Sequence, residues 1–597
     1  MANESESSAI KGLDALYEFE REPVSVGKLQ SGKHFAGVYA GEHVAGTEFV
    51  IGALFVAWGA TAYNIFVGLL IGNLLAVLTW TFVCAPIAVR TRLTLYWYLR
   101  KIAGPVTTAI YNILNAVLFC ILAGCMITVS ASAIRIPFGI PAQTQWYPQD
   151  IRFVLVVIVV GAVVVTLAIL GFKRLAQFSE VCSPWMFLMF IAGAIAIFPI
   201  LAKEVLGGQM GSLSDFWKIA NQAIWTGKTP DGQDGVSFWR VAAFAWICNL
   251  AMHGGLSDMA LLRYAKRASY GLYSAFGMFL GHYLAWICAG IMGATTALIL
   301  KTTMSRLDAG DVAYQALGVT GIVTVLLAGW TTSNPTLYRA GLAFQAVTPG
   351  WPRWLVTLVA GVVTTVIACS PFVFTKLLDF VGLYGLLLMP VGAIVFVEHW
   401  IFPKLGFTQF WVSKKKLAVS WPALASWGIA MLVAVIIQED SPLVSLLKWV
   451  RLQAVADFVA KAGFLHLFFL FIPVWILTAA LYIVFASMAG AREEFADDLE
   501  DSAHPQTAVK PQEPPAELPK WAEIPKKSDP VLWISGAVAI ASLALCLILP
   551  IWVYRTGGED YERNFAWFKQ ILIVPTLIYF VTGTIWMVKR DKGDQNA

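Results

Sequence analysis

The sequence predicts an all-α, multi-span membrane protein built as a five-plus-five inverted repeat, and three observations lead to this fold class. First, 58% of the 597 residues are apolar and 13% are charged, and the mean hydropathy is +0.69. Second, apolar runs of roughly 18 to 25 residues, each long enough as a helix to cross about 30 Å of hydrocarbon, recur along nearly the whole chain. Third, glycines and polar residues interrupt the first and the sixth of these runs.

We expect about fourteen membrane spans. Their approximate bounds are 35–59, 61–84, 105–133, 152–171, 183–202, 237–258, 270–300, 317–345, 353–370, 378–402, 419–438, 463–489, 531–553 and 566–588. Clusters of Lys and Arg follow spans 2, 4, 6 and 10, which end on one side of the membrane, and cytoplasmic loops accumulate these residues. We therefore expect a multi-pass protein of a cell inner or plasma membrane with both termini in the cytoplasm.

The spans predict seven regions along the chain. These are a cytoplasmic segment at 1–34, a first repeat of spans 1–5 at 35–202, an extracellular loop at 203–236, a second repeat of spans 6–10 at 237–402, spans 11 and 12 with an amphipathic segment at 403–489, an acidic and proline-rich cytoplasmic linker at 490–530, and spans 13 and 14 at 531–597. The linker has too little apolar surface to fold alone. Two roles stay open for spans 13 and 14, stabilisation of the fold and oligomerisation.

Hydroxyls, an amide and a proline interrupt the eighth span in the stretch Ala328-Gly-Trp-Thr-Thr-Ser-Asn-Pro-Thr-Leu-Tyr-Arg-Ala-Gly341. Polar side chains at bilayer depth are costly and usually functional. Thr331 and Thr332 follow Ala328 at i+3 and i+4, so one carbonyl and two hydroxyls share a helical face. Oxygen ligands of this kind suit a small hard cation. The stretch therefore predicts half of an ion site.

The first span is interrupted at Gly41-Glu42-His43-Val44-Ala45-Gly46-Thr47-Glu48. Glycine makes unwinding of a helix cheap, and unwound carbonyls can ligate a cation. Thr47 and Glu48 are candidates to face the substrate. An alternative stays open for Glu42 and Glu48, that they simply lie near a water-filled vestibule.

The sixth span is interrupted around Asn249, His253, Gly254 and Gly255. Histidine can donate, accept or carry a proton, which suits a pocket, although a lone histidine is also often a satisfied core residue. Two broken spans, one early and one five spans later, are typical of transporters in which repeats 1–5 and 6–10 hold the substrate between the breaks. The ion site then lies between spans 1 and 8.

Five stretches, in order along residues 35–440, resemble the nucleobase:cation symporters, specifically their purine and cytosine permease branch. They are Gly59-Ala-Thr-Ala-Tyr-Asn-Ile-Phe-Val-Gly-Leu-Leu-Ile-Gly-Asn-Leu-Leu75, Arg90-Thr-Arg-Leu-Thr94, Arg263-Tyr-Ala-Lys266, Trp330-Thr-Thr-Ser-Asn-Pro-Thr-Leu-Tyr338, and Phe380-Val-Gly382 through Pro390-Val-Gly392. The resemblance implies a leucine-transporter-like fold, to which about four C-terminal membrane helices are added here.

The resemblance also implies site residues. The sodium site of the family falls on a span 1 carbonyl near Gly46, the Ala328 carbonyl and the hydroxyls of Thr331 and Thr332. The base-binding glutamine of span 3 aligns with Asn115, and the position of the stacking tryptophan is Leu118, with Phe119 adjacent. In span 6, Ala251 and His253 replace an aromatic and a small polar residue, and the aspartate is displaced to Asp258. Together with the residues of the two broken spans, the predicted substrate-binding set is Thr47, Glu48, Asn115, Phe119, Asn249, His253 and Gly254.

The predicted function is inward symport of a nucleobase or related small heterocycle, driven by sodium or protons, with no cofactor. Nothing resembles a P-loop, a catalytic triad or a zinc cluster, so we expect neither an enzyme nor an ATP-driven pump. The expected partners are a small-molecule substrate, a coupling cation and the lipid bilayer, and not a nucleic acid. Glu48 has three open roles, as a cation ligand, a proton carrier or a counter-ion for a substrate amine. Two alternatives therefore remain, a transporter of an amine, amino acid or other organic solute and, less favoured, a solute sensor that does not transport.

Overall fold

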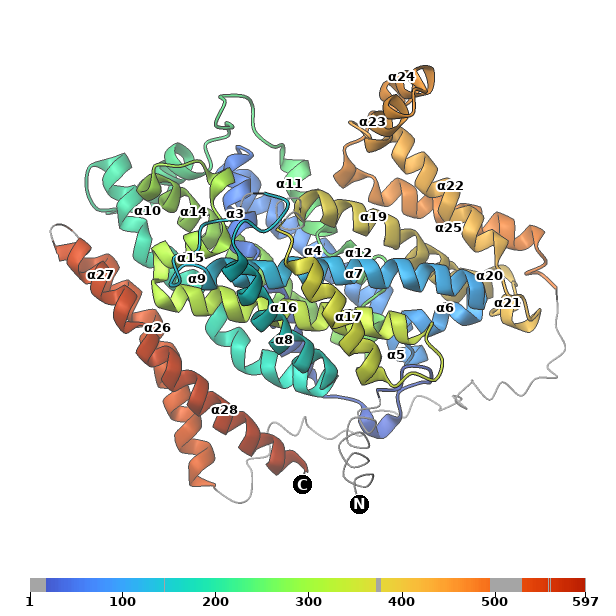
Figure 1. Ribbon diagram of the computed structural model, residues 1–597, viewed down its shortest axis with the longest axis horizontal. Coiled ribbons are helices and arrows are strands. Elements are labelled where there is room, and N and C mark those ends of the chain that lie inside the picture. Colours follow the sequence, from blue (N-terminus) through green and yellow to red (C-terminus); the bar gives the residue numbers. More distant parts are fainter. Residues whose placement is uncertain are drawn as a thin grey trace.

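The structure is a computed structural model that describes residues 18–143, 145–371, 377–493, 529–556, 558 and 560–595. Its named elements are helices (Figure 1). In the described part of the chain, nine helices are long and apolar enough to cross a membrane, or ten if the bent pair of the first span counts as one. Most of the predicted linker at 490–530 and the first half of the segment at 1–34 lie outside the described residues.

The predicted first repeat contains a broken span followed by four further spans. Its helices are α2 (Gly32–His43), α3 (Glu48–Ala57), η2 (Asn64–Gly68), α4 (Leu69–Thr79), η3 (Trp80–Cys84), α5 (Ala85–Thr91), α6 (Leu95–Ala103), α7 (Pro105–Ile134), α8 (Ile151–Ile169) and α9 (Phe172–Leu206). Two short helices, α10 (Leu213–Ile219) and η4 (Ala220–Ile224), lie in the predicted extracellular loop.

The predicted second repeat also starts with a broken span. Its helices are α11 (Phe238–Ile247), α12 (Leu250–His253), α13 (Met259–Leu262), η5 (Ala268–Tyr273), η6 (Phe276–Ala285), α14 (Trp286–Leu300), α15 (Ala309–Leu317), α16 (Val319–Gln345), α17 (Arg353–Ala368), α19 (Leu377–Phe396), η8 (Val397–Ile401) and α20 (Phe402–Leu405).

The remaining helices lie at two edges of the molecule (Figure 1). One group consists of α21 (Trp411–Lys414), α22 (Trp421–Ile437), α23 (Pro442–Trp449), α24 (Gln453–Ala462) and α25 (Phe471–Met488). The other group, at the opposite edge, consists of α26 (Pro530–Thr556), α27 (Asp560–Ile571) and α28 (Ile573–Gln595). Where the sequence predicts one amphipathic segment after span 11, the structure has the two short helices α23 and α24.

The break in the first span is shorter than the interrupted stretch at 41–48. α2 stays helical through His43, only residues 44–47 separate it from α3, and the two half-helices bend by 50°. Glu48 opens α3, so its carboxylate lies in the first turn, where the helix dipole favours negative charge. Most residues of both half-helices are buried. α3 packs tightly on α14, where a Cβ at Gly52 would lie 2.5 Å from the carbonyl oxygen of Trp286.

The break in the sixth span is longer and leaves only short helical turns between Cys248 and Arg263. Leu256 has φ +64°, a left-handed conformation that is strained for a branched residue. Glycine on a neighbouring helix permits this course, because a Cβ at Gly392 of α19 would overlap the carbonyl oxygen of Gly254. The unwound segment therefore lies directly against the backbone of α19.

The C-terminal helices are attached to α9 and reach the start of α2. Along α9, Tyr561 donates to the carbonyl of Ala196 at 2.8 Å and Tyr579 to that of Val181 at 2.7 Å. At the end of α28, Arg590 pairs with Glu180 of α9 at 2.6 Å. His34 of α2 contacts the same Glu180 carboxylate, so one acid of α9 joins the first half-helix to the last helix of the chain.

Candidate functional site

A cluster of oxygens joins the first span to α16. The Thr332 hydroxyl lies 2.8 Å from the carbonyl oxygen of Glu42 and 2.9 Å from that of Ala328, and the Thr331 hydroxyl lies 3.1 Å from the Ala328 carbonyl. Pro335 has no N–H to donate to the Thr331 carbonyl four residues earlier. Carbonyl and hydroxyl oxygens without a nitrogen or sulfur are the ligands that a small hard cation prefers.

The span 1 carbonyl in this cluster belongs to Glu42. Gly46, the residue implied by the resemblance, lies about one turn nearer the start of α16, where an added Cβ would meet Val129 and lie 3.2 Å from the carbonyl oxygen of Val325. The difference arises because α2 remains helical through His43, which brings its last turn rather than the break itself against Thr332.

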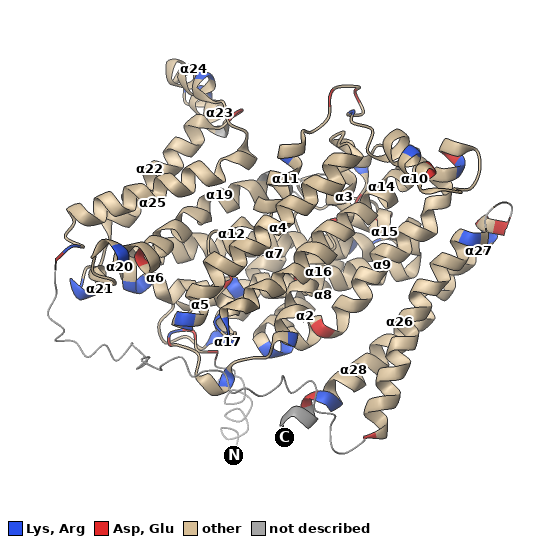
Figure 2. Cartoon of the chain, turned by 180° about the vertical axis from the view of Figure 1, so that it is seen from behind, with Lys and Arg blue, Asp and Glu red and all other residues tan. Residues whose placement is uncertain are grey.

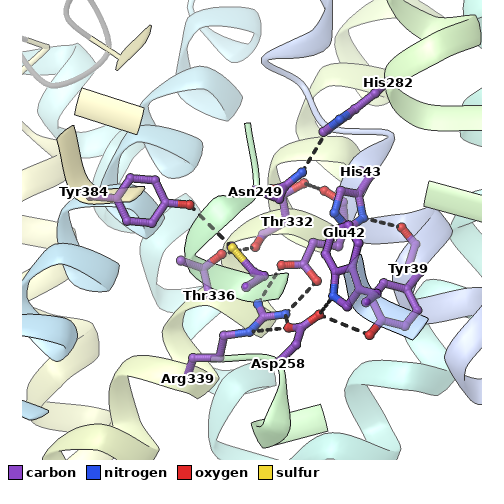
Figure 3. Close-up of polar contacts among 12 residues, drawn as sticks. Tyr39, Glu42, His43, Asn249, Asp258, His282, Thr332, Thr336, Arg339 and Tyr384 are labelled. Atoms are coloured by element: carbon purple, nitrogen blue, oxygen red, sulfur yellow. Dashed lines mark hydrogen bonds and ion pairs between the residues drawn. The ribbon is translucent and has the colours of Figure 1, made fainter. Parts of the chain in front are cut away.

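Below the oxygen cluster, one arginine joins three elements (Figure 3). Arg339 of α16 binds Glu42 of α2 with two nitrogens, at 2.6 and 3.0 Å, and its Nε donates to Asp258 at 3.0 Å. Tyr39 and Trp80 donate to the other oxygen of Asp258, at 3.1 and 2.5 Å. The exposed fractions of Glu42, Asp258 and Arg339 are 4%, 0% and 0%, so this ion cluster is sealed from water.

On the other side of the break, Glu48 has very different neighbours. Trp286 donates its indole N–H to one carboxylate oxygen, and Nε2 of His282 lies 3.8 Å from the other. The imidazole of His282 stacks on Trp286 with ring centroids 4.3 Å apart and lies 3.5 Å from the amide nitrogen of Asn249. Among the described residues, no Lys or Arg lies within 4.0 Å of the Glu48 carboxylate. Glu48 is therefore a buried acid whose nearest ionisable neighbour is a histidine.

Two further histidines have fixed tautomers. Nδ1 of His43 is 2.8 Å from the carbonyl of Tyr39, and Nε2 of His253 is 2.9 Å from the carbonyl of Trp246. A neutral imidazole that donates through one nitrogen accepts through the other. Nε2 of His43 and Nδ1 of His253 are thus buried acceptors without a protein donor. Such orphaned atoms are rare in native structures and are commonly completed by a ligand or water.

Asn115 adds a third unpaired acceptor on α7. Its amide nitrogen donates to Ser257, at 3.3 Å, and to Tyr111, at 3.2 Å, which leaves the amide oxygen without a partner. Because Ser257 belongs to the unwound part of span 6, this contact places Asn115 at the second break. Asn115 therefore contacts the same broken segment of span 6 that contains His253, and a pocket shared by the two stays a prediction.

Three other residues of the predicted substrate-binding set, Phe119, Gly254 and Thr47, make mainly packing contacts. Phe119 makes an edge contact with Tyr384 of α19, with ring centroids 6.1 Å apart, and the Tyr384 hydroxyl lies 3.5 Å from the sulfur of Met252. Gly254 packs against Gly392, which makes its role one of close backbone approach. Thr47 is buried at the start of α3 without capping that helix.

Sequence reasoning missed Arg339, His43 and His282 as candidate site residues. A signal existed for each: Arg339 is a charge within an apolar span, His43 lies beside Glu42 in the interrupted stretch, and His282 follows a glycine in span 7. What the sequence did not contain was their pairing, because the partners Arg339 and Glu42 are 297 residues apart.

The proteins to which the chain is similar include transporters. No protein-family model matches the chain. The cytosine permease of Escherichia coli (strain K12) is 23% identical over 191 residues, which are 32% of this chain and 42% of the permease, so the match spans less than half of that relative. The cytosine permease of Escherichia coli O157:H7 matches with the same values.

Two solved structures share the fold over most of the chain. Mhp1, a nucleobase-cation-symport-1 family transporter in a closed conformation with bromovinylhydantoin bound, has a TM-score of 0.57 at 15% identity and covers 80% of this chain and 96% of its own. A Na⁺-coupled sialic acid symporter in a substrate-bound outward-open state has a TM-score of 0.52 at 12% identity. The match covers 81% of this chain and 93% of the symporter.

These likenesses confirm the predicted fold class, an all-α, multi-span membrane protein with a leucine-transporter-like fold. They also confirm the resemblance to cytosine permeases, as distant homology. The proteins to which the chain is similar are transporters and not enzymes. The cytoplasmic orientation of the termini stays a prediction.

Proposed function

We propose that this protein is a cation-coupled secondary transporter that carries a small nitrogen heterocycle of the nucleobase class together with sodium. One observation carries the proposal. Glu42 and Asp258 share the single guanidinium of Arg339, so the buried cluster has one excess negative charge when both acids are ionised. The backbone carbonyl of the same Glu42 belongs to the oxygen cluster at Thr332. A monovalent cation among those oxygens neutralises that charge where water cannot.

Sodium fits the oxygen cluster better than a proton does. Carbonyls of Glu42 and Ala328 and the hydroxyls of Thr331 and Thr332 are neutral oxygens, which ligate a hard metal cation but hold a proton only weakly. The ligands come from α2 and α16, so the bound ion would stabilise the contact between the first half-helix and α16. This coupling between ion occupancy and helix position is what alternating access requires.

In this proposal, the substrate binds between the breaks of the first and sixth spans. The unpaired acceptors His43 Nε2, His253 Nδ1 and Asn115 Oδ1 suit the N–H groups of a heterocycle edge. The rings of Trp80 and His253 have centroids 4.7 Å apart, so these two residues form an aromatic contact next to the break of span 6. Mhp1 holds a hydantoin and the curated relatives are cytosine permeases, which supports this substrate class.

The test is thermal unfolding of the purified full-length protein with purines, pyrimidines, hydantoins, amines and amino acids, each in sodium and in potassium. A ligand at about 100 times its Kd adds roughly 2.7 kcal/mol of stability. We expect a base to stabilise the protein, and more so in sodium. Stabilisation by bases that is equal in the two salts would contradict sodium coupling, and no response to any base would contradict the substrate class.

A second candidate substrate class is an amine or another organic cation, which one observation favours. Glu48 is buried, and no Lys or Arg lies within 4.0 Å of its carboxylate in the described part of the chain. A cationic group of the substrate would therefore provide the opposite charge that this carboxylate lacks. Competition distinguishes the two classes, because amines and not bases would then displace a bound ligand. Counterflow in liposomes by the purified protein would exclude a sensor that does not transport.

A further inference from the structure

A basic cavity lies outside the central site, where the end of α6 and the start of α7 meet α21 and the residues that follow it. It has a volume of about 430 Å³ and is formed by the end of α6, the start of α7 and the segment between α21 and α22. Hydrogen bonds hold these parts together: the Ser413 hydroxyl donates to the carbonyl of Lys101 at 2.7 Å, and the backbone N–H groups of Val106 and Ser420 donate to the carbonyls of Ala418 and Ala103, each at 3.0 Å. The cavity is therefore a built feature of the fold.

The lining of the cavity is positively charged. Arg100, Lys101 and Lys416 line it, and none of its lining residues is acidic. Among the described residues, no carboxylate lies within 4.0 Å of Arg100 or Lys416. The Arg100 guanidinium lies 5.2 Å from the centre of the Trp97 ring, a contact that holds it in place without neutralising it. Figure 2 shows Lys and Arg gathered around α6 and α21. An anion is the ligand that such a cavity favours.

An apolar stripe starts at the same cavity. Pro105 lines the cavity, and the next residues of α7 on one face, Val106, Ile110, Ile113 and Val117, are 48%, 47%, 49% and 43% exposed. Their spacing of four, three and four residues keeps them in one row along the helix. In a membrane-spanning helix this row faces hydrocarbon chains. Trp421, 47% exposed at the start of α22, is of the type that lies at the level of lipid headgroups.

We propose that this cavity binds the phosphate headgroup of an anionic phospholipid, whose acyl chain follows the apolar stripe of α7. A charged headgroup pocket that continues into an exposed apolar row matches both ends of a phospholipid, whereas a soluble anion would use only the first. Arg100 and Lys416 supply charge-assisted hydrogen bonds to phosphate oxygens. Because Arg100 belongs to the first repeat and Lys416 follows the second, the lipid headgroup would contact two parts of the chain that also contact each other directly.

The experiment measures the thermal midpoint of the full-length protein in detergent during titration with dioleoyl-phosphatidylglycerol, dioleoyl-phosphatidylcholine or soluble glycerol 3-phosphate. We expect stabilisation by phosphatidylglycerol and neither of the others. In Arg100→Gln/Lys416→Gln the apparent affinity for phosphatidylglycerol should fall roughly 30-fold, since each basic residue near an anionic lipid contributes on the order of fivefold. Lys28→Gln/Lys404→Gln, with the same change of charge at exposed lysines that do not line the cavity, should keep the response.

Three outcomes would overturn the proposal. Equal stabilisation by phosphatidylcholine would mean that charge is not recognised. An equal effect of glycerol 3-phosphate that is lost in the double variant would identify a site for free anions. A full phosphatidylglycerol response in the double variant would place the lipid elsewhere. If the double variant does not fold, Lys416→Gln alone, at an exposed residue, is compared with Lys404→Gln by the same titration.

Discussion

Two acids lie on either side of the break in the first span, and their surroundings differ. Glu42, before the break, is bound by both terminal nitrogens of Arg339. Glu48, after the break, receives an indole N–H and has a histidine 3.8 Å away. Both are almost fully buried. The difference teaches that burial alone does not define the role of an acid: Glu42 shares an arginine with Asp258, whereas Glu48 has no Lys or Arg within 4.0 Å among the described residues.

Removal of the shared cation should have the largest effect. Arg339→Met leaves Glu42 and Asp258 buried without compensation, and we expect a loss of roughly 3–5 kcal/mol of unfolding free energy. Chemical unfolding of the purified protein measures it. Arg339→Lys is the matched control and should lose less, although an ammonium cannot bind Glu42 with two nitrogens. An Arg339→Met protein as stable as the wild type would show that the pairing contributes nothing.

The oxygen cluster above the arginine should control the response to sodium. Thr332→Ala removes the hydroxyl that lies between the carbonyls of Glu42 and Ala328, and the sodium concentration for half-maximal thermal stabilisation should rise about tenfold, which corresponds to roughly 1.4 kcal/mol. Thr332→Ser keeps the hydroxyl and should respond like the wild type. An unchanged sodium titration in Thr332→Ala would move the ion site away from α16.

Neutralising each acid in turn compares the two sides of the break directly. Glu42→Gln breaks an ion pair with Arg339 and should cost roughly 1–3 kcal/mol, whereas Glu48→Gln removes an acid without a Lys or Arg partner and should change stability by less than about 1 kcal/mol. If the substrate is an amine or another organic cation, ligand-induced stabilisation should show the reverse order, with the larger loss in Glu48→Gln, because Glu48 is then the acid that binds the cationic group. Equal destabilisation by the two variants would mean that Glu48 is a structural acid like Glu42.

The weakest effect is expected for the ion pair that joins the last helix, α28, to α9. Arg590→Gln removes the 2.6 Å pair with Glu180, but Arg590 is partly exposed, so we expect a loss of at most about 1 kcal/mol. The thermal midpoint, read at low and high salt, measures this change. A loss as large as that of Arg339→Met would show that the C-terminal helices are required for the fold of the core.

Local patterns were sufficient for the fold class and for the two broken spans, and the ion site that they predict at Ala328, Thr331 and Thr332 stays a prediction. Hydropathy identifies a membrane helix from about 20 consecutive residues, and the i+3 and i+4 spacing places Thr331 and Thr332 beside Ala328 within a single helix. Glycines and polar residues at 41–48 and 249–255 marked both broken spans. These features depend on neighbours in the sequence, and for that reason the fold class followed from the sequence.

The pairing of distant helices followed only from the tertiary structure. The sequence implied a carbonyl near Gly46, but the helical continuation of α2 brings the Glu42 carbonyl to Thr332 instead. It contained Arg339 and His282, yet nothing local assigns the first to Glu42 and the second to Glu48. The physical reason is that helical periodicity fixes which side chains share a face, whereas the packing of whole helices decides which faces meet.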